Sequence, residues 1–267
     1  MSLMVRDVRY RYAGASRPAL DGLSLELQRG RVVGVVGRNG AGKSTLCLVA
    51  AGLAPATIGG RLEGRVQIDG LDSSTAAPHE LAQRCGILFQ NPAAQMSGTS
   101  PTVWEEVAFG PRNLGLGLDD VVERVETALA ALRVAALAPR DPERLSGGQA
   151  QLVALAGVLA LRPSYLLLDE PTSQLDPLGT RLVGEAIGDL VARTGAGVLV
   201  VEHRADLLHR IADDVAVLVD GEIVRAGQAG EVLADERLVG WGIEPPAHVR
   251  LGRAAVAAAV VLPALDR

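Results

Sequence analysis

Apolar residues along the chain gather in short runs that predict buried strands. Residues 32–37, with the sequence VVGVVG, form a β-branched run of the kind found in parallel sheets. Residues 165–170 (YLLLDE) and 197–203 (GVLVVEH) form two more runs, and each ends in acidic or titratable residues. Residues 45–53 (TLCLVAAGL) predict a helix soon after the first strand. The order of strand, glycine-rich loop and helix is typical of a phosphate-binding loop.

Alternating apolar and polar positions predict a second kind of strand. Residues 64–70 (GRVQIDG) and 213–227 (DDVAVLVDGEIVRAG) alternate in this way, and each includes an Asp-Gly pair. Because Asp-Gly favours tight turns, these segments predict antiparallel strands and hairpins.

The middle of the chain, from about residue 92 to residue 163, has helical spacing instead. One set of apolar residues recurs at helical intervals at Val122, Val125, Leu129 and Leu132. A second set does so at Leu152, Leu155, Ala156 and Leu159. A strand-rich body interrupted by a helical insert predicts two lobes, and the sequence has no repeat at solenoid spacing.

Composition narrows the class of protein. The chain has 267 residues, of which 48% are hydrophobic and only 3% aromatic, so aliphatic side chains must fill a sizeable core. The net charge of −5 argues against a general nucleic-acid binder, although it is compatible with a local basic patch. The two cysteines, Cys47 and Cys85, make neither a disulfide framework nor a zinc site.

The apolar stretches of the sequence are too short for a membrane span. The first ten residues lack the apolar core of a signal peptide. The longest apolar stretch, residues 254–265, is shorter than the ~18 residues of a membrane helix and contains Pro263, so it predicts a terminal helix. We therefore expect a soluble chain whose role at a membrane would require a partner.

The stretch GRNGAGKST at residues 37–45 carries the first chemical motif. Its glycines let backbone N–H groups turn toward phosphate oxygens, and the dipole of the following helix adds to the attraction. Lys43 is the only lysine among the 26 lysine and arginine residues, and it can supply a positive charge to the β- and γ-phosphates. Ser44 can supply an oxygen to Mg²⁺. The expected nucleotide-binding residues of this loop are Gly37, Asn39, Gly40, Gly42, Lys43, Ser44 and Thr45.

Two acidic residues end the apolar run at 165–170. Because ligands gather at the carboxyl ends of parallel strands, we expect Asp169 and Glu170 beside the phosphate loop. Asp169 is suited to hold Mg²⁺, and Glu170 is suited to polarise an attacking water as a general base. An acidic pair after a strand can also form a simple turn, but the phosphate loop upstream favours the catalytic interpretation.

The stretch LSGGQ at residues 145–149 predicts a second anion site. Ser146 can cap a helix, and Gly147 and Gly148 expose backbone N–H groups at the positive end of its dipole. An isolated SGG usually marks only a helix start. Here it lies twenty residues before YLLLDE in a chain that already has a phosphate loop.

In this order the motifs resemble those of the nucleotide-binding subunit of ATP-binding cassette (ABC) transporters, over nearly the full chain. The phosphate loop resembles the Walker A motif, LSGGQ the signature motif and YLLLDEP the Walker B motif. The resemblance implies an α/β P-loop NTPase fold with a mainly parallel sheet core, an N-terminal antiparallel β subdomain and an inserted α-helical subdomain. It also implies a nucleotide-binding domain at residues 1–240, a helical subdomain at about 92–163 within it, and a C-terminal extension or linker at 241–267.

Four further positions match the motifs of that family. Gln90 in FQNP looks like the Q-loop glutamine, a ligand of Mg²⁺ and water that senses the membrane partner. His203 in VEHR looks like the switch histidine that contacts the γ-phosphate. Asp176 in SQLD resembles the D-loop aspartate, although Gln174 departs from the usual S-A-L-D at a position that faces the partner subunit. Tyr12 lies where the family stacks an aromatic ring on adenine, and its alternative role is that of an ordinary edge-strand tyrosine.

The resemblance implies a mechanism that needs two ABC ATPase subunits. They face each other head to tail, and the loop of Ser146, Gly147, Gly148 and Gln149 in one covers the γ-phosphate held by Lys43 of the other. ATP closes this dimer and hydrolysis releases it. The second subunit can be a copy of this chain or a different ATPase. A transmembrane transporter subunit converts closure into transport, so the chain is expected as a peripheral protein on the cytoplasmic face of the cell membrane.

Residues 89–116 resemble one branch of the family, the energy-coupling-factor (ECF) importers. Their ATPases share FQNP, EVAFGP and NLGL with this stretch, and VEHR also fits them. That branch takes up vitamins or ions such as cobalt and nickel through a substrate-binding membrane subunit, and no nucleic acid is expected as a partner. Residues 52–70 resemble the first of two ATPase domains in fused forms, so a standalone subunit and part of a longer protein are both possible.

Two other classes of ABC protein are the alternatives. One is the ATPase subunit of another ABC importer or of an exporter. The other is a soluble ABC ATPase of DNA repair or translation, which the ordinary interval between Gln90 and Ser146 and the lack of sustained heptads disfavour. Trp104 is a candidate contact for the membrane subunit, with local packing as its alternative. His79, His209 and His248 are scattered in the sequence and are expected at the surface or in packing.

Overall fold

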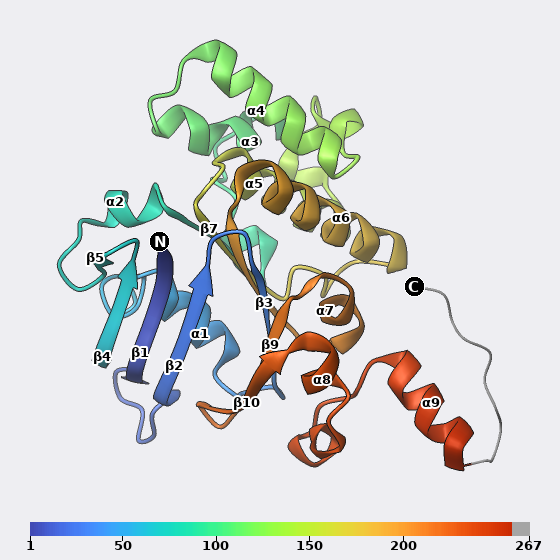
Figure 1. Cartoon of the computed structure of the whole chain (residues 1–267). Helices are drawn as coiled ribbons and strands as arrows, with labels where there is room; N and C mark the ends of the chain where they lie inside the picture. Colours follow the sequence, from blue (N-terminus) through green and yellow to red (C-terminus); the bar gives the residue numbers. More distant parts are fainter. Residues whose placement is uncertain (258–267) are drawn as a thin grey trace.

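A six-stranded sheet forms the centre of the molecule, in a computed structural model that describes residues 1–257. The strands lie in the order β10-β9-β3-β8-β7-β6 (Figure 1). They are β3 (Val32–Val36), β6 (Cys85–Leu88), β7 (Tyr165–Asp169), β8 (Gly197–Glu202), β9 (Asp214–Val219) and β10 (Glu222–Gln228). Pairing is parallel from β9 to β6, and β10 joins the edge as an antiparallel hairpin with β9. The predicted parallel core and this hairpin are therefore present.

Alternate side chains of the parallel strands enter two separate hydrophobic cores. In β8, Val198 and Val200 face the first core, whereas Leu199 and Val201 face the second. Helices on the first side are α5 (Gly147–Ala160), α6 (Pro177–Thr194) and α7 (Ala205–Ile211). On the second side lie α1 (Lys43–Ala50) and a separate antiparallel sheet. Because both faces are covered, every residue of β3, β7 and β8 is buried, which explains their continuous apolar runs.

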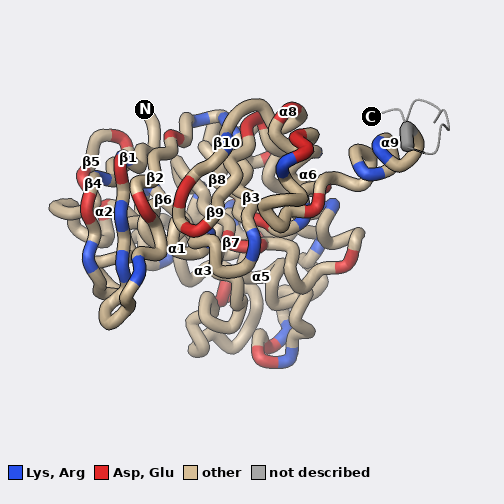
Figure 2. The backbone as a smooth tube through the Cα atoms, turned by 90° about the horizontal axis from the view of Figure 1, so that it is seen from below, with Lys and Arg blue, Asp and Glu red and all other residues tan. Residues whose placement is uncertain are grey.

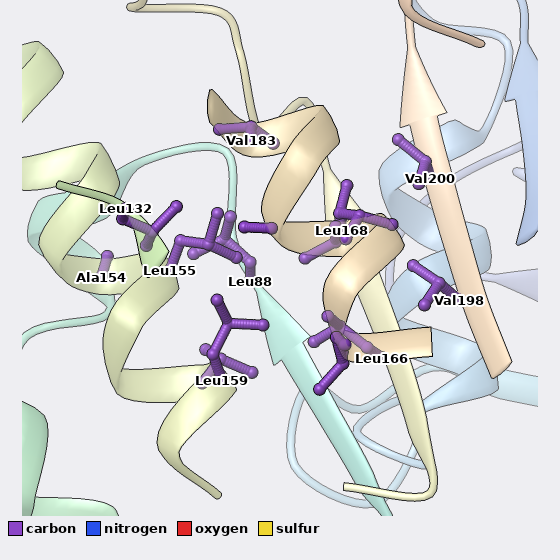
Figure 3. Close-up of a cluster of buried hydrophobic side chains, with 14 of the residues drawn as sticks. Leu88, Leu132, Ala154, Leu155, Leu159, Leu166, Leu168, Val183, Val198 and Val200 are labelled. Carbon is purple, nitrogen blue, oxygen red and sulfur yellow. The ribbon is translucent and has the colours of Figure 1, made fainter. Parts of the chain in front are cut away.

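Figure 3 shows how the first core joins helix to sheet. Side chains of α5 lie toward the strands, and the labelled residues come from β6, α5, β7, α6 and β8, together with Leu132 at the end of α4. Leu155 of α5 and Leu166 and Leu168 of β7 are fully buried there. These contacts hold the helix that begins with the LSGGQ stretch against the strand that ends in Asp169.

The antiparallel sheet has the order β2-β1-β4-β5. Its strands are β1 (Ser2–Arg11), β2 (Leu20–Gln28), β4 (Arg61–Ile68) and β5 (Leu71–Asp72). One face is buried against α1 through residues such as Leu3, Leu23 and Ile68, while the other carries charged side chains. The predicted N-terminal antiparallel sheet is therefore also present.

The helical insert consists of α3 (Val103–Asn113), α4 (Leu118–Ala131) and the adjoining α5, and it lies at one end of the molecule (Figure 1). In α4 the buried face is formed by Val121, Val125, Ala128 and Leu129. Val122 is only half-buried, so the prediction that placed it on the apolar face is wrong by one residue. Val121 and Val125 are four residues apart and lie on one face, whereas Val122 is rotated by about 100° from Val121.

The remaining elements are short or lie near the C-terminus. They are α2 (Pro78–Ala82), α8 (Ala229–Leu233), α9 (Ala247–Ala257) and 3₁₀ turns at Pro92–Ala94, Ala135–Leu137, Pro142–Arg144 and Glu236–Trp241. The terminal helix predicted at 254–265 begins within α9, and the rest of it lies outside the described residues. His209 of α7 and His248 of α9 are distant in the sequence but neighbours in the fold, with ring centroids 4.1 Å apart.

Charged residues are mixed along the folded chain. Figure 2 shows basic and acidic positions interspersed on both the antiparallel sheet and the helices. Among residues 1–257, no helix combines the length and the apolar character that crossing a membrane requires.

Candidate functional site

The phosphate loop lies between β3 and α1, at the carboxyl end of the central strand of the sheet. Gly40 and Gly42 have φ angles of 80° and 105°, in the region that favours glycine. A Cβ on Gly42 would lie 2.4 Å from the carbonyl oxygen of Ala19, and one on Gly37 would lie 2.5 Å from that of Leu218. Neighbouring backbone therefore restricts both positions to glycine.

Lys43 begins α1 and turns its side chain back into the loop. Its Nζ donates to the carbonyl oxygens of Gly37 at 2.9 Å and Arg38 at 3.2 Å, and it lies 3.5 Å from His203 Nδ1. Only 5% of the residue is exposed. Burial lowers the pKa of Lys43, and the nearby carboxylates of Glu170, Asp169 and Glu202 oppose that shift.

Glu170 follows β7 with a φ of 50°, and its carboxylate is held from two sides. Gln90 Nε2 donates to Glu170 Oε2 at 2.7 Å, and His203 Nε2 lies 2.5 Å from Glu170 Oε1. The Glu170 side chain is 8% exposed, against 37% for His203. The structure thus brings together the three residues predicted to be catalytic, from the ends of β6, β7 and β8.

Asp169 lies one residue before Glu170, at the end of β7. Burial raises the pKa of Asp169, while a hydrogen bond to Ser44 acts in the opposite direction. Its buried Oδ1 has no hydrogen-bond partner among the described residues. An unpartnered carboxylate oxygen next to a serine hydroxyl offers the kind of oxygen ligands that suit Mg²⁺.

Tyr12 lies at the edge of the phosphate loop. Its hydroxyl is 3.1 Å from Thr45 Oγ1, and its ring meets that of Tyr10 edge to face, with centroids 4.9 Å apart. The ring is half-buried, and Asn39 at the tip of the loop is exposed. Tyr12 is therefore close enough to the loop to contact a nucleotide bound there.

The LSGGQ residues form a separate surface. Ser146 caps α5, since its Oγ accepts from Gln149 N at 3.4 Å, and Gln149 Oε1 accepts from Ser146 N at 3.1 Å. Ser146 and Gly147 are exposed. No hydrogen bond or ion pair recorded within residues 1–257 links Ser146, Gly147, Gly148 or Gln149 to Lys43.

The SQLD segment packs beside that surface in the same chain. A Cβ on Gly147 would lie 2.4 Å from Gln174 Oε1, so the Gln174 side chain rests on Gly147. Asp176 caps α6 by accepting from Gly179 N at 2.7 Å. The structure therefore gives Asp176 a helix-capping contact at the start of α6.

Two buried residues were missed by the sequence analysis. Glu202 precedes His203 and Thr172 follows Glu170 by two positions, and the Thr172 hydroxyl donates to Glu202 Oε1 at 2.6 Å. The only signal was a charged residue at the end of an apolar strand. That signal could not predict Thr172 as the partner of Glu202, because the two residues are thirty positions apart in the sequence.

Comparison with known proteins identifies the family that uses this arrangement. The ABC transporter family matches residues 20–173, which span more than half of the chain and include the phosphate loop, LSGGQ and Glu170. The chain belongs to the ABC transporter family. As an ABC ATPase subunit it binds and hydrolyses ATP, so the predicted enzyme class is confirmed.

Similar proteins place the chain more closely within the ABC family. The energy-coupling factor transporter ATP-binding protein EcfA of Methanothermobacter thermautotrophicus is 41% identical over 88% of this chain and 73% of its own. Among solved structures, CbiO1 of Clostridium perfringens, described as part of the ABC transporter complex CbiONQ, is 30% identical. It covers 97% of this chain and 98% of its own, with a TM-score of 0.77.

A further solved ATP-binding cassette was captured as a dimer with ADP and phosphate in a post-hydrolysis state. It is 26% identical, covers 85% of this chain and 98% of its own, and has a TM-score of 0.74. The predictions of the ABC ATPase fold, of an ECF-type subunit and of the ATPase component of a membrane importer are therefore confirmed.

Proposed function

We propose that this ABC ATPase hydrolyses ATP with Glu170 as the general base. The observation that carries the proposal is the convergence of Gln90 and His203 on the Glu170 carboxylate, beside the Lys43 ammonium. Lys43 and the backbone N–H groups of the loop bind the phosphates. A Glu170 oxygen accepts the proton of the attacking water, while Gln90 and His203 hold the carboxylate in place.

Mg²⁺ fits the oxygen ligands beside the loop. Ser44, Asp169 and Gln90 would hold the ion, and the unpartnered Asp169 Oδ1 supports this assignment. When bound, Mg²⁺ neutralises charge on the β- and γ-phosphate oxygens. Tyr12, at the loop edge, stacks on the adenine.

The complete site requires a second ABC ATPase subunit. Among residues 1–257 no hydrogen bond or ion pair joins Lys43 to the LSGGQ loop, and this exposed loop is free to cover the γ-phosphate of a partner's site. The dimeric cassette with ADP and phosphate supports such an arrangement. Because ATP binds better to the closed dimer than to separate subunits, it shifts the population toward closure.

The transport role follows from the relatives. We propose that the chain is a peripheral subunit at the cytoplasmic face of the cell membrane, bound to a transmembrane subunit and a substrate-binding membrane subunit. The cargo is a vitamin or a transition-metal ion. Support comes from the EcfA relative and from CbiO1, which is part of the CbiONQ complex.

Replacement of the proposed base tests the hydrolytic site. Glu170→Gln keeps the hydrogen bond to Gln90 in one orientation but removes the proton acceptor. We expect kcat to fall by about 10²-fold or more, the usual size of a general-base contribution, while the Kd for ATP changes little. Steady-state turnover and equilibrium nucleotide binding measure the two quantities.

The matched control is Glu222→Gln, the same change at an exposed position of β10. Its turnover should equal that of the wild type. Wild-type turnover of Glu170→Gln would exclude Glu170 as the base.

A further inference from the structure

Glu202 is a buried carboxylate that the proposed hydrolysis does not use. It ends β8, and only 2% of the residue is exposed. Removing a carboxylate from water without partners is strongly unfavourable, so the contacts that compensate Glu202 are informative. They lie within the site itself, since Glu202 directly precedes His203.

The Glu202 carboxylate accepts hydrogen bonds from two segments of the chain. Its Oε1 accepts from the Thr172 hydroxyl at 2.6 Å and from Thr172 N at 3.2 Å. Its Oε2 accepts from His203 N at 3.2 Å, and the backbone of Arg204 also donates to the carboxylate. Thr172 is fully buried.

These two segments carry the reacting groups. Thr172 stands two residues after Glu170, and His203 follows Glu202 directly. A parallel link runs between the same segments, because Glu170 N donates to the carbonyl oxygen of Val201 at 2.9 Å. The side chains of Glu170 and His203 then meet at 2.5 Å. Glu202 therefore joins the backbone that presents the base to the backbone that presents the histidine.

We propose that Glu202 is a positioning residue, whose hydrogen bonds to Thr172 and to the His203 backbone fix Glu170 and His203 in the geometry that activates water. This inference rests on the roles proposed above for Glu170 and His203. It adds a buried residue that acts through these two.

The donors around Glu202 explain why a carboxylate is required. Three of the four groups that face it are backbone N–H groups, which can only donate. A glutamine of the same size has one accepting oxygen and one donating amide. In either orientation of the amide, its NH₂ group faces a backbone N–H, that of Thr172 or that of His203, and two donors then oppose each other. Glu202→Gln therefore weakens the link between the segments while it leaves the contacts of the phosphate loop intact.

A second variant separates the hydrogen bonds from the charge. Glu202 acts on Lys43 through space, because its negative charge opposes the lowering of the Lys43 pKa. Thr172→Val keeps that charge and the shape of the side chain but removes the hydroxyl donor. If the hydrogen bond between Thr172 and Glu202 matters, rather than the negative charge of Glu202, then Glu202→Gln and Thr172→Val should both lower kcat.

The test compares the full-length chain with Glu202→Gln, Thr172→Val and the double variant at equal protein concentration. Measurements are kcat, KM, the Kd for ATP and the thermal midpoint. We expect kcat to fall about tenfold in Glu202→Gln and about threefold in Thr172→Val, the range of single hydrogen bonds to a charged group. KM and Kd should stay within about twofold, and the double variant should resemble Glu202→Gln because the changes share one contact.

Three results would overturn the inference. They are an unchanged kcat in Glu202→Gln, fully additive effects in the double variant, and losses of kcat explained by the unfolded fraction alone. If Glu202→Gln does not fold, an unchanged kcat in Thr172→Val overturns it instead. His203→Ala is measured in parallel: wild-type turnover there would refute the proposed function, whereas an inactive His203→Ala with a fully active Glu202→Gln refutes only the role of Glu202.

Discussion

Lys43 illustrates how a single side chain is selected by the space around it. Its ammonium lies among the carbonyl oxygens of Gly37 and Arg38, 2.9 and 3.2 Å away, in a loop that neighbouring backbone keeps narrow. A compact group with three rotatable donors can exchange those carbonyls for phosphate oxygens. A planar guanidinium is larger and its donors are fixed in a fork.

We therefore expect Lys43→Arg to fail, even though every other position counted as lysine or arginine is an arginine. The Kd for ATP should rise by about tenfold or more, since at least one charge-assisted hydrogen bond is lost. Equilibrium nucleotide binding and steady-state turnover measure the effect. Arg65→Lys, the reverse change at an exposed position of β4, is the control and should leave both values unchanged. An active Lys43→Arg enzyme would contradict this explanation.

At the scale of elements, one polar cluster ties the two sheets together at the end opposite the site. The Tyr165 hydroxyl, at the start of β7, donates to Asp69 Oδ1 at 2.5 Å, and Arg29 Nη2 donates to Asp69 Oδ2 at 2.6 Å. Burial, followed by the Asp69 carboxylate, raises the pKa of Tyr165 to about 12. The hydroxyl therefore stays protonated and able to donate at neutral pH.

Tyr165→Phe should lower the free energy of unfolding by about 1–2 kcal/mol, because the buried Asp69 carboxylate loses a donor. Denaturant unfolding measures this change. ATP turnover of the folded variant should stay at the wild-type value, since Tyr165 lies at the opposite end of β7 from Asp169. A specific loss of kcat would show that the cluster also affects the catalytic end.

The helix capped by Ser146 allows a test of the composite site. Ser146→Arg places a bulky cation on an exposed surface that would face the partner's γ-phosphate. We expect turnover to fall by about tenfold or more, equivalent to at least ~1.4 kcal/mol of transition-state stabilisation, while ATP binding to the isolated subunit persists.

Ser146→Ala is the matched control for that variant. It removes the same helix cap, which costs about 1 kcal/mol of stability, without adding bulk. Turnover should therefore remain near the wild-type value in Ser146→Ala. Equal losses in both variants would indicate a cap effect rather than a contact with the partner's nucleotide.

The helices and strands also show how much of the fold can be predicted from the sequence alone. Continuous apolar runs located β3, β7 and β8 because both of their faces are covered, and the motif residues stand at their carboxyl ends. In α4 a pair of adjacent valines, Val121 and Val122, left the buried face ambiguous by one residue. The partners of Glu202 could not be predicted, because they depend on how two strands pair in space.

At the scale of the whole molecule, the proposed composite site predicts that the specific activity depends on protein concentration. No hydrogen bond or ion pair among residues 1–257 joins Lys43 to Ser146, and under the proposed composite site hydrolysis requires an encounter between two subunits. For the isolated chain, specific activity should rise with protein concentration and then reach a plateau as the dimer forms. Turnover measured across a dilution series, with sizing by light scattering, tests this. Constant specific activity from a protein that remains monomeric would contradict the composite site.

The position of the only lysine has a practical consequence for proteolysis. A protease that cuts only after lysine has one target bond in this sequence, between Lys43 and Ser44, and yields fragments 1–43 and 44–267. In the native fold that bond lies at the start of α1, and Lys43 is 5% exposed, so cleavage requires the loop and the first helical turn to open. The fraction of intact chain on a gel thus records how often the phosphate loop opens, and added nucleotide should preserve the full-length band.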